Sequence, residues 1–282
     1  MKRSYKLYVT LLLVLGLMIV VAQAIYNYAE QKLYHEAILD HQQQTHKTIQ
    51  ALIQEQKYAS MTLALSLAEN PIVQHLLQPS SESHRYRKKL SNLITNINQQ
   101  KGFKNLWVQL IDIEGNSRYR SWTKKSGDSL LAVRHEISET LNRPEPRQVM
   151  SVGKFTLSFK SMMPVFDDEQ QLVGLVEVIT QFTPLTEKLS QNTGIDSVLL
   201  TDKRYQKQLI KADASQFLDG FYVTNNDADT ALLTLIRKHG VDRFVEMESY
   251  SLLDGYVVTR LPLKNTEGVI QAHWIGFIPQ EY

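Results

Sequence analysis

Residues 106–122 read LWVQLIDIEGNSRYRSW, and this stretch decides the fold. Two runs rich in β-forming residues, 106–112 and 117–122, lie on either side of a short polar segment. That segment contains Gly115 and Asn116, which both tolerate the positive φ angles of a tight turn. The pattern therefore predicts a β-hairpin, and a hairpin of this kind begins an antiparallel sheet.

The residues that follow extend this sheet. A second pair of β-type runs occupies 156–165 and 172–180, and a shorter run lies at 148–152. A helical pattern over 85–100 precedes the first hairpin, and another over 127–142 separates the two pairs of strands. We expect a compact α+β module in which the five strands form one antiparallel sheet.

The N-terminus carries a membrane signal. Residues 7–25 contain no charge, and this uncharged segment is about as long as a helix that spans a bilayer. Lys2, Arg3 and Lys6 precede this segment, so the positive-inside rule keeps the N-terminus in the cytoplasm. We expect a single-pass anchor in a bacterial inner membrane, with the bulk of the chain in the periplasm. A small-x-small sequence at 22–24 leaves a cleaved signal peptide as the alternative.

A long helix should follow the anchor. Residues 26–70 contain neither Gly nor Pro, and Pro71 ends the run. We call 26–70 the stalk helix. Its second half has an apolar stripe at helical spacing, and we expect a homodimer through 26–57.

The last hundred residues repeat the order of elements seen in the first module. Residues 164–178 and 262–276 each contain a strand ending near Pro, a polar turn and a hydrophobic strand. A period near one hundred residues indicates duplicated domains, because solenoid repeats are roughly 20 to 50 residues long. The further elements predicted here are strands at 197–202, 207–211, 243–249, 255–262 and 269–277, and a helix at 228–239. The expected organisation is an anchor at 1–25, the stalk helix at 26–70, and sheet modules at 71–182 and 183–282.

An anchor, a long helix and two tandem PAS-like modules together resemble the double Cache (dCache) sensors of bacterial chemoreceptors, histidine kinases and diguanylate cyclases. The residues that carry the resemblance are Asp112, Gly115, Arg120, Ser121, Trp122, Gly127, Asp128, Leu130, Arg134, Gly153, Pro164, Val165 and 172–177. The resemblance implies that the membrane-distal module, 71–182, holds a small molecule. It also implies that the proximal module, 183–282, passes the change to a second transmembrane helix and a cytoplasmic output. Because the sequence given stops at Tyr282, we expect either a receptor fragment or an independent sensor with a separate signalling partner.

The first strand pair carries the best candidate ligand residues. Arg120 and Trp122 are two positions apart and so share one face of a strand, which places a guanidinium beside an aromatic wall. This pair suits a small carboxylate or a ring. Tyr119 points the other way on a regular strand and would need a bulge to join them. The dCache members that bind amino acids use a tyrosine, an arginine-x-tryptophan and a later aspartate, and only Arg120-x-Trp122 matches here.

Four more residues complete the predicted site. Arg134 lies two helical turns after Gly127 in the predicted helix, and Glu177 is an acid within an apolar strand that needs a partner. Phe159 and Ser161 share one face of a returning strand, and Lys160 on the other face is predicted to be solvated. The alternative for Arg120 and Arg134 is structural, because either can pair with Asp112, Asp128 or Glu177.

Composition excludes several classes of function. The net charge is +2, with three positive charges ahead of the apolar segment, so nucleic acid is not an expected partner. Cysteine is absent, and the sequence contains no nucleophile elbow, phosphate-binding loop or zinc-protease motif. We expect no enzyme, no cofactor and no metal. The favoured hypothesis is a periplasmic small-molecule sensing module, and the alternative is a periplasmic module or accessory subunit that binds a partner protein.

Overall fold

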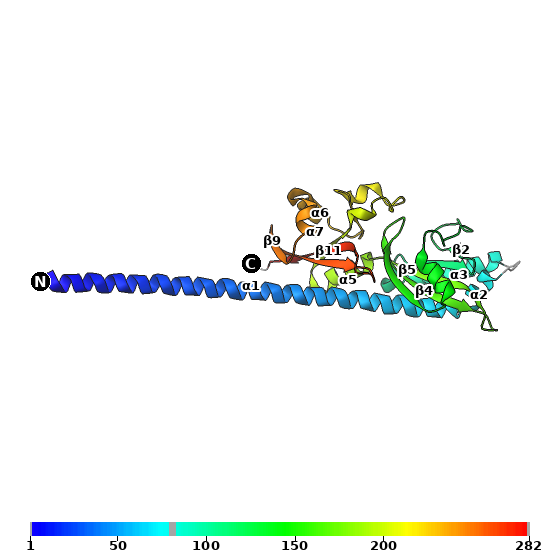
Figure 1. Cartoon of the computed structure of the whole chain (residues 1–282), viewed down its shortest axis with the longest axis horizontal. Helices are drawn as coiled ribbons and strands as arrows, with labels where there is room; N and C mark the ends of the chain where they lie inside the picture. Colours follow the sequence, from blue (N-terminus) through cyan, green and yellow to red (C-terminus); the bar gives the residue numbers. More distant parts are fainter. Residues whose placement is uncertain (1, 79–82, 281–282) are drawn as a thin grey trace. The chain divides into compact units, whose positions relative to one another are not determined.

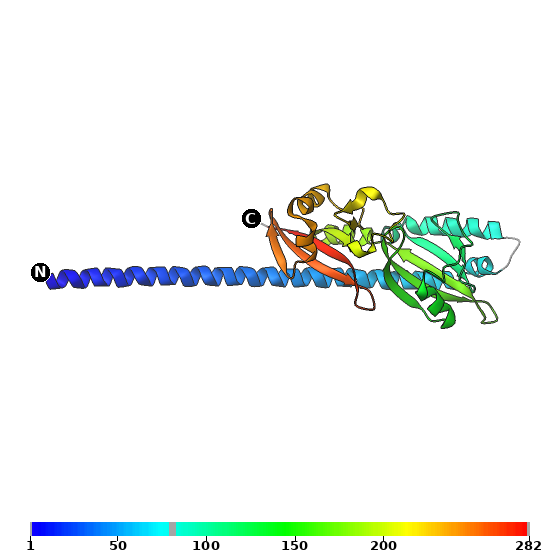
Figure 2. The same ribbon diagram turned by 45° about the horizontal axis from the view of Figure 1, so that its top comes forward.

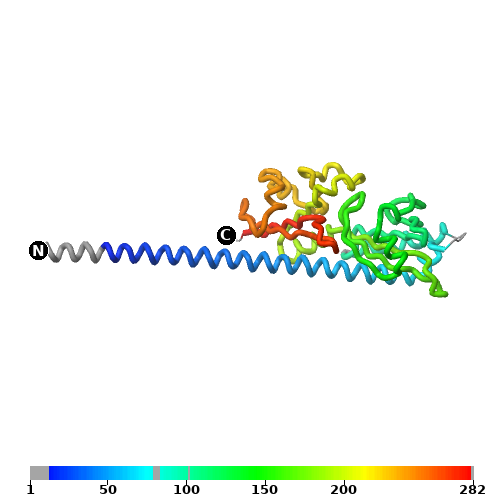
Figure 3. Tube along the Cα trace, viewed as in Figure 1, coloured from blue at the N-terminus to red at the C-terminus, as the bar shows by residue number. Residues whose placement is uncertain are grey.

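The computed structural model describes residues 2–78 and 83–280, and these fall into two compact units, Met1–Lys47 and Thr48–Tyr282. Helix α1 (Lys2–Ala68) runs through the first unit and supplies the start of the second; Figure 3 traces most of it in blue. Among the described residues, one helix near the N-terminus is long and apolar enough to cross a membrane. The predicted anchor and stalk helix are therefore one continuous helix, which ends close to the predicted Asn70.

The predicted hairpin and strands form one antiparallel sheet of five strands (Figure 1), in the order β2-β1-β5-β4-β3. The strands are β1 (Trp107–Asp112), β2 (Ser117–Arg120), β3 (Arg147–Val152), β4 (Leu157–Phe166) and β5 (Leu172–Thr180). The hairpin turn is closed by Asp112, whose carboxylate accepts a hydrogen bond of 2.7 Å from the Asn116 backbone N–H. Gly115 has a φ of +76°, which fits glycine. The turn chemistry expected from the sequence is confirmed.

One face of this sheet packs on helices. The helices are the C-terminal part of α1, α2 (Pro71–Leu77) and α3 (Ser83–Asn98), and a short 3₁₀ turn, Lys101–Phe103, leads into β1. Apolar side chains of the helices and of β1, β4 and β5 share one core, which includes Leu67, Leu90, Leu110, Val165 and Val176. Burial of this core holds the end of α1 against the sheet.

The opposite face is covered by residues 121–146, and here one prediction is wrong. The helix predicted over 127–142 is only α4 (His135–Asn142). The preceding residues instead bond to the hairpin, since Gly127 N–H donates to Ser117 O, and Leu130 N–H donates to Gly115 O. Those tertiary backbone bonds replace the helical ones, and Gly127 has a φ of +93°. Leu131 and Val133, which a helix over 127–142 would turn towards the sheet, are 38% and 68% exposed.

The second sheet has six strands in the order β7-β8-β6-β11-β10-β9. Its strands are β6 (Asp196–Thr201), β7 (Phe217–Leu218), β8 (Phe221–Val223), β9 (Tyr250–Leu253), β10 (Tyr256–Lys264) and β11 (Ile270–Pro279). Its helices are α5 (Thr183–Thr193), α6 (Thr230–His239) and α7 (Val241–Val245). Figure 1 shows α6 and α7 together on one side of β11, and Figure 2 shows this orange and red sheet separate from the green one.

Two predicted strands of this half are wrong. Residues 207–211 form turns after a 3₁₀ segment, Lys203–Tyr205, which Asp202 caps by accepting a bond from Arg204 N–H. Residues predicted as a strand over 243–249 lie largely in α7 and the turn after it. The reason is the spacing of Val241, Phe244 and Val245, all buried on one helical face.

The internal repeat is supported by the register of the strands. Pro164 pairs with Leu175 between β4 and β5, and Pro262 pairs with His273 between β10 and β11. Each strand pair has an irregularity just after its proline, between Val165 and Phe166 in the first and between Leu263 and Lys264 in the second. Each turn begins with a side chain that accepts two backbone N–H groups, Asp167 in the first and Asn265 in the second. The two halves can therefore be compared position by position.

Candidate functional site

The face of the first sheet that lies under residues 121–146 carries a row of polar groups. Across neighbouring strands, Arg120 pairs with Gln109, Gln109 with Glu177, and Glu177 with Met162. Side chains directly opposite each other in a sheet lie on the same face. Charged groups from several strands therefore meet in the middle of a covered surface.

Arg134 and Glu177 form the centre of this row. Arg134 Nη2 donates to Glu177 Oε1 at 2.5 Å, and Arg134 Nε donates to Glu136. Glu177 is completely buried. Burial alone would raise the pKa of Glu136, but the charge and hydrogen bond of Arg134 hold it below its usual range. Burial likewise opposes the charge of Arg134, but the carboxylates of Glu177 and Glu136 raise its pKa, so the guanidinium stays ionised at neutral pH.

Lys160 lies on the same face of β4 and is 5% exposed. Its Nζ donates to Ser151 O at 3.0 Å and to Ser151 Oγ at 2.5 Å. In the described parts of the chain, no carboxylate oxygen lies within 4.0 Å of Nζ. The prediction that Lys160 is solvated is wrong, because β4 is paired on both sides and this face is covered. The lysine is a buried cation without a direct counter-ion.

The buried position of Lys160 predicts an unusual dependence of stability on pH. Burial, reinforced by Arg134, lowers the pKa of Lys160 to about 8, although Glu177 and Glu136 act in the opposite direction. Between about pH 8 and the ordinary lysine pKa of about 10.4, the unfolded chain therefore holds one more proton than the folded chain. The free energy of unfolding should rise with pH across this window, by on the order of 3 kcal/mol.

The prediction is checked by urea unfolding of the wild type and of Lys160→Met at about pH 7.5 and about pH 10, which lie near the two ends of this window. The difference between the two proteins isolates Lys160 from the other groups that titrate. An equal response of both proteins to pH would show that Lys160 does not titrate in this range.

Arg120 holds the covering segment to the sheet. Its guanidinium makes two hydrogen bonds to Asp128, of 2.6 Å and 2.9 Å, and a third of 3.2 Å to Lys125 O. These bonds from Arg120 lower the pKa of the Asp128 carboxyl. In the amide orientation that satisfies both of its ends, Gln109 donates to Glu177 at 3.2 Å and accepts from Arg120 Nε at 3.3 Å. Of the alternatives left open by the sequence, Arg120 pairs with Asp128 and Arg134 with Glu177.

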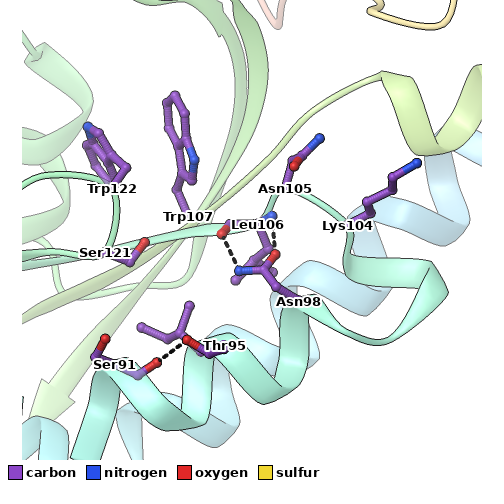
Figure 4. A pocket seen from close by; sticks show the side chains of 10 residues that line it. Ser91, Thr95, Asn98, Lys104, Asn105, Leu106, Trp107, Ser121 and Trp122 are labelled. Carbon is purple, nitrogen blue, oxygen red and sulfur yellow. Dashed lines mark hydrogen bonds between the residues drawn. The ribbon is translucent and has the colours of Figure 1, made fainter. Parts of the chain in front are cut away.

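An aromatic group stands at one end of this face. The rings of Trp107 and Trp122 stack with centroids 4.9 Å apart, and Phe155 meets Trp107 edge-on at 5.4 Å. Strand β2 ends at Arg120, earlier than the predicted Trp122, and a cavity of about 280 Å³ opens beyond its end. Figure 4 shows both indoles on one side of the chain and Ser121 and Asn98 on the other. The cavity thus adjoins the aromatic group.

Asn98 replaces the missing strand partner beside this cavity. Its Nδ2 donates to Leu106 O at 3.0 Å, and its Oδ1 accepts from Leu106 N–H at 2.7 Å (Figure 4). Because Leu106 is buried, Asn98→Ala should leave its carbonyl unsatisfied, while its N–H keeps a bond of 3.1 Å to Phe103 O. The free energy of unfolding should fall by about 1–2 kcal/mol. Chemical denaturation measures this. Asn92→Ala, at an exposed position of the same helix, is the control and should change stability by less than about 0.5 kcal/mol. If Asn98→Ala and Asn92→Ala changed stability equally, the bonds from Asn98 to Leu106 would not contribute to stability.

The structure brings together four of the seven residues predicted for the site. Arg120, Arg134 and Glu177 lie in the polar row, and Trp122 lies in the aromatic group at its end. Arg134 arrives there from the residue before α4 and not from the stripe of a longer helix, as the sequence had suggested. Alternation along β2 therefore predicted that Arg120 and Tyr119 lie on opposite faces of the sheet, as they do. The predicted helix did not explain how Arg134 reaches Glu177.

The other three residues lie on the helix-facing side of the sheet. Tyr119 is buried in the core beneath α3, and that burial raises its pKa. Phe159 packs on Phe182, with ring centroids 4.4 Å apart. Ser161 Oγ lies 2.8 Å from Ser60 Oγ of α1. They are separated from the polar row by the sheet itself.

Three residues of the polar face were missed: Lys160, Glu136 and Gln109. The position of Lys160 in the sequence could have revealed its burial. A lysine inside a long strand of mostly apolar residues is buried when strands pair with it on both sides. No pattern in the sequence marks Glu136, whose place depends on the fold of the covering segment. Gln109 is a single polar residue within the apolar run of the first strand, and nothing in the sequence distinguishes it from a polar residue without a role in the site.

The chain is similar to one protein family and to several solved structures. A family model described as the double sensory domain of two-component sensor kinases, dCache_3, matches residues 36–268. Among solved structures, the sensor domain of the Vibrio cholerae histidine kinase DctB is 16% identical, covering 88% of this chain and 99% of that one, with a TM-score of 0.48.

The V. cholerae LuxQ periplasmic domain is 14% identical, covering 84% of this chain and 99% of that one, with a TM-score of 0.48. The ligand-binding domain of the Campylobacter jejuni chemoreceptor Tlp3, solved with 4-methylisoleucine, is 14% identical, covering 86% and 90%, with a TM-score of 0.46. No curated protein matches the chain. The family model, which covers most of the sequence, is the finding that identifies the chain.

Proposed function

Because this chain belongs to the dCache_3 family, the double sensory domains of two-component sensor kinases, we propose that it senses a small molecule outside the bacterial cytoplasm. We place it in the inner membrane as a single-pass protein with its N-terminus in the cytoplasm. Support comes from the one apolar helix near the N-terminus and from Lys2, Arg3 and Lys6 ahead of its uncharged segment. The two sheets then lie in the periplasm, with the first sheet in the distal module, 71–182, and the second in the proximal module, 183–282.

The proposed ligand binds on the covered face of the first sheet. The observation that carries this proposal is Lys160, a buried ammonium with no carboxylate within 4.0 Å in the described residues. A buried charge without an ionic partner is costly, so an anionic group that reaches Nζ would be held strongly. The ligand class is therefore a small organic acid or an amino acid, with its carboxylate at Lys160 and its apolar part towards Trp107 and Trp122.

The signal is proposed to be a shift between two conformations. Arg120–Asp128 and Arg134–Glu177 hold the covering segment onto the sheet, so a ligand at Lys160 competes for the same charges. Strand β4 connects this face to α1, because the neighbour of Lys160 is Ser161, which bonds Ser60 of α1. A small movement of β4 would therefore displace α1.

The output is proposed to lie in another polypeptide or in a further part of the same receptor. A homodimer through 26–57 of α1 would carry the displacement towards the membrane. Large apolar side chains on that helix are exposed in the single chain, including Tyr26 at 64% and Leu33 at 67%. Sedimentation of the protein in detergent gives the mass, and a strictly monomeric mass contradicts the dimer.

A ligand screen tests the proposed function. Thermal unfolding of the full chain in detergent is measured with a library of organic acids, amino acids and their uncharged amides. A compound present at one hundred times its Kd should add about 2.7 kcal/mol to the free energy of unfolding. We expect stabilisation by at least one carboxylate and none by its amide. Stabilisation only by a purified periplasmic protein would instead support the protein-binding module.

A further inference from the structure

The second sheet carries a charged group at a position where the first sheet has none. Since the strand pairs have the same register, Arg260 and Ile275 in β10 and β11 correspond to Met162 and Glu177 in β4 and β5. The first sheet thus has an acid on its fifth strand, which Arg134 neutralises. The second sheet has a base on β10, Arg260, opposite the apolar Ile275 on β11.

Arg260 is held in place by neutral groups alone. Its Nε donates to His273 Nδ1 at 3.1 Å, and its Nη1 donates to Met247 O at 2.9 Å. In the described part of the chain, no carboxylate oxygen lies within 4.0 Å of the guanidinium. An arginine stays ionised in proteins, so the positive charge persists at this half-buried position. Both hydrogens of Nη2 are left without a partner among the described residues.

His273 orients the guanidinium without adding a charge. Its side chain is 6% exposed, and an Nδ1 that accepts a bond from Arg260 places the ring proton on Nε2, 3.8 Å from Asp202. Burial, with a smaller effect of Arg260, lowers the pKa of His273 to about 4, so the ring is neutral at physiological pH. Asp202 is itself bonded to Arg204, at 3.0 Å and 3.2 Å. The acid nearest to His273 is therefore already paired.

From these contacts we propose that Arg260 is the anchor of a second small-molecule site, separate from the first sheet, that binds the carboxylate of a small organic acid. A guanidinium fork matches the two oxygens of a carboxylate, and two neutral acceptors keep it fixed. The ring of Phe221, whose centroid is 6.3 Å from that of His273, is buried in the core of this half and packs near the imidazole. A short carboxylate fits the guanidinium that His273 and Met247 hold.

The test uses acetate as the probe and acetamide as its uncharged analogue. Thermal unfolding of the full chain in detergent is measured at constant ionic strength, in the wild type and in Lys160→Met. The Lys160→Met protein lacks the proposed site on the first sheet, so acetate bound there cannot contribute to its Tm. Acetate should raise the Tm of both proteins, and acetamide should raise the Tm of neither. Arg260→Met should weaken the binding of acetate, measured by this rise in Tm, roughly tenfold or more.

The variants are matched to the fold. Arg260→Met introduces the residue that the first sheet has at the equivalent position, Met162, so the protein should keep its fold. Arg237→Gln, at an exposed position of α6, is the control and should leave the response unchanged. The proposal is overturned if acetate acts equally on Arg260→Met and wild type, or if acetate and acetamide act alike. Because Lys160→Met does not touch this site, failure here leaves the proposed function intact.

Discussion

Glu177→Ala is expected to destabilise the protein by about 3–5 kcal/mol, because it leaves a half-buried arginine and a buried lysine with too little negative charge. Arg134 would keep Glu136 as its acid, and Lys160 would lose the larger of the two negative charges that balance it. In a folded unit of this size the Tm should fall by on the order of 10 °C. Thermal and urea unfolding of the full chain in detergent measure the change.

Two variants separate charge from other effects. Glu177→Gln keeps the volume and a hydrogen-bond acceptor but removes the charge, so it should account for most of the loss. Glu169→Ala, in the exposed turn between β4 and β5, should change stability by less than about 0.5 kcal/mol. If Glu177→Ala behaved like Glu169→Ala, the polar row would not be an energetically coupled cluster.

Lys160→Met should weaken binding of the ligand strongly while leaving the unliganded protein at least as stable as the wild type. The substitution replaces a buried, unpaired ammonium with an apolar side chain of similar length, which removes a desolvation penalty. Loss of a charge-assisted bond to a buried carboxylate should weaken binding by roughly 10- to 100-fold. Calorimetry with a carboxylate from the screen measures the affinity, and unfolding measures the stability.

Lys154→Met provides the matched control. It makes the same change in the exposed turn between β3 and β4, and it should alter neither binding nor stability. Unchanged affinity in Lys160→Met would remove the buried lysine from the ligand site. A loss of folding in place of a loss of binding would show that the ammonium is part of the structural framework.

Much of the fold could be predicted from local chemistry. The turn at Gly115 and Asn116 and the repeat around Pro164 and Pro262 follow from residue types and spacing, and the structure contains both. The helix predicted over 127–142 is wrong for its first part, residues 127–134. That segment satisfies its backbone groups by bonding to the hairpin, and tertiary bonds of this kind leave no periodic signal in a sequence.

The candidate site was harder to predict than the strands that carry it. Alternation along β4 correctly put Phe159 and Ser161 on one side and Lys160 on the other. It did not reveal which side meets the helices, because apolar residues occur on both faces of a doubly covered strand. Phe159 and Ser161 were therefore included in the predicted site and Lys160 was left out. Only the packing of α1 to α3 on one face decides the question.

Hydrogen exchange with and without a carboxylate from the screen tests the central proposal most directly. If the ligand binds the covered face of the first sheet, amide protection should increase over residues 121–146 and along β4 and β5, and Lys160→Met should show no such increase. Protection confined to exposed surfaces of α1, or present unchanged in Lys160→Met, would contradict the account.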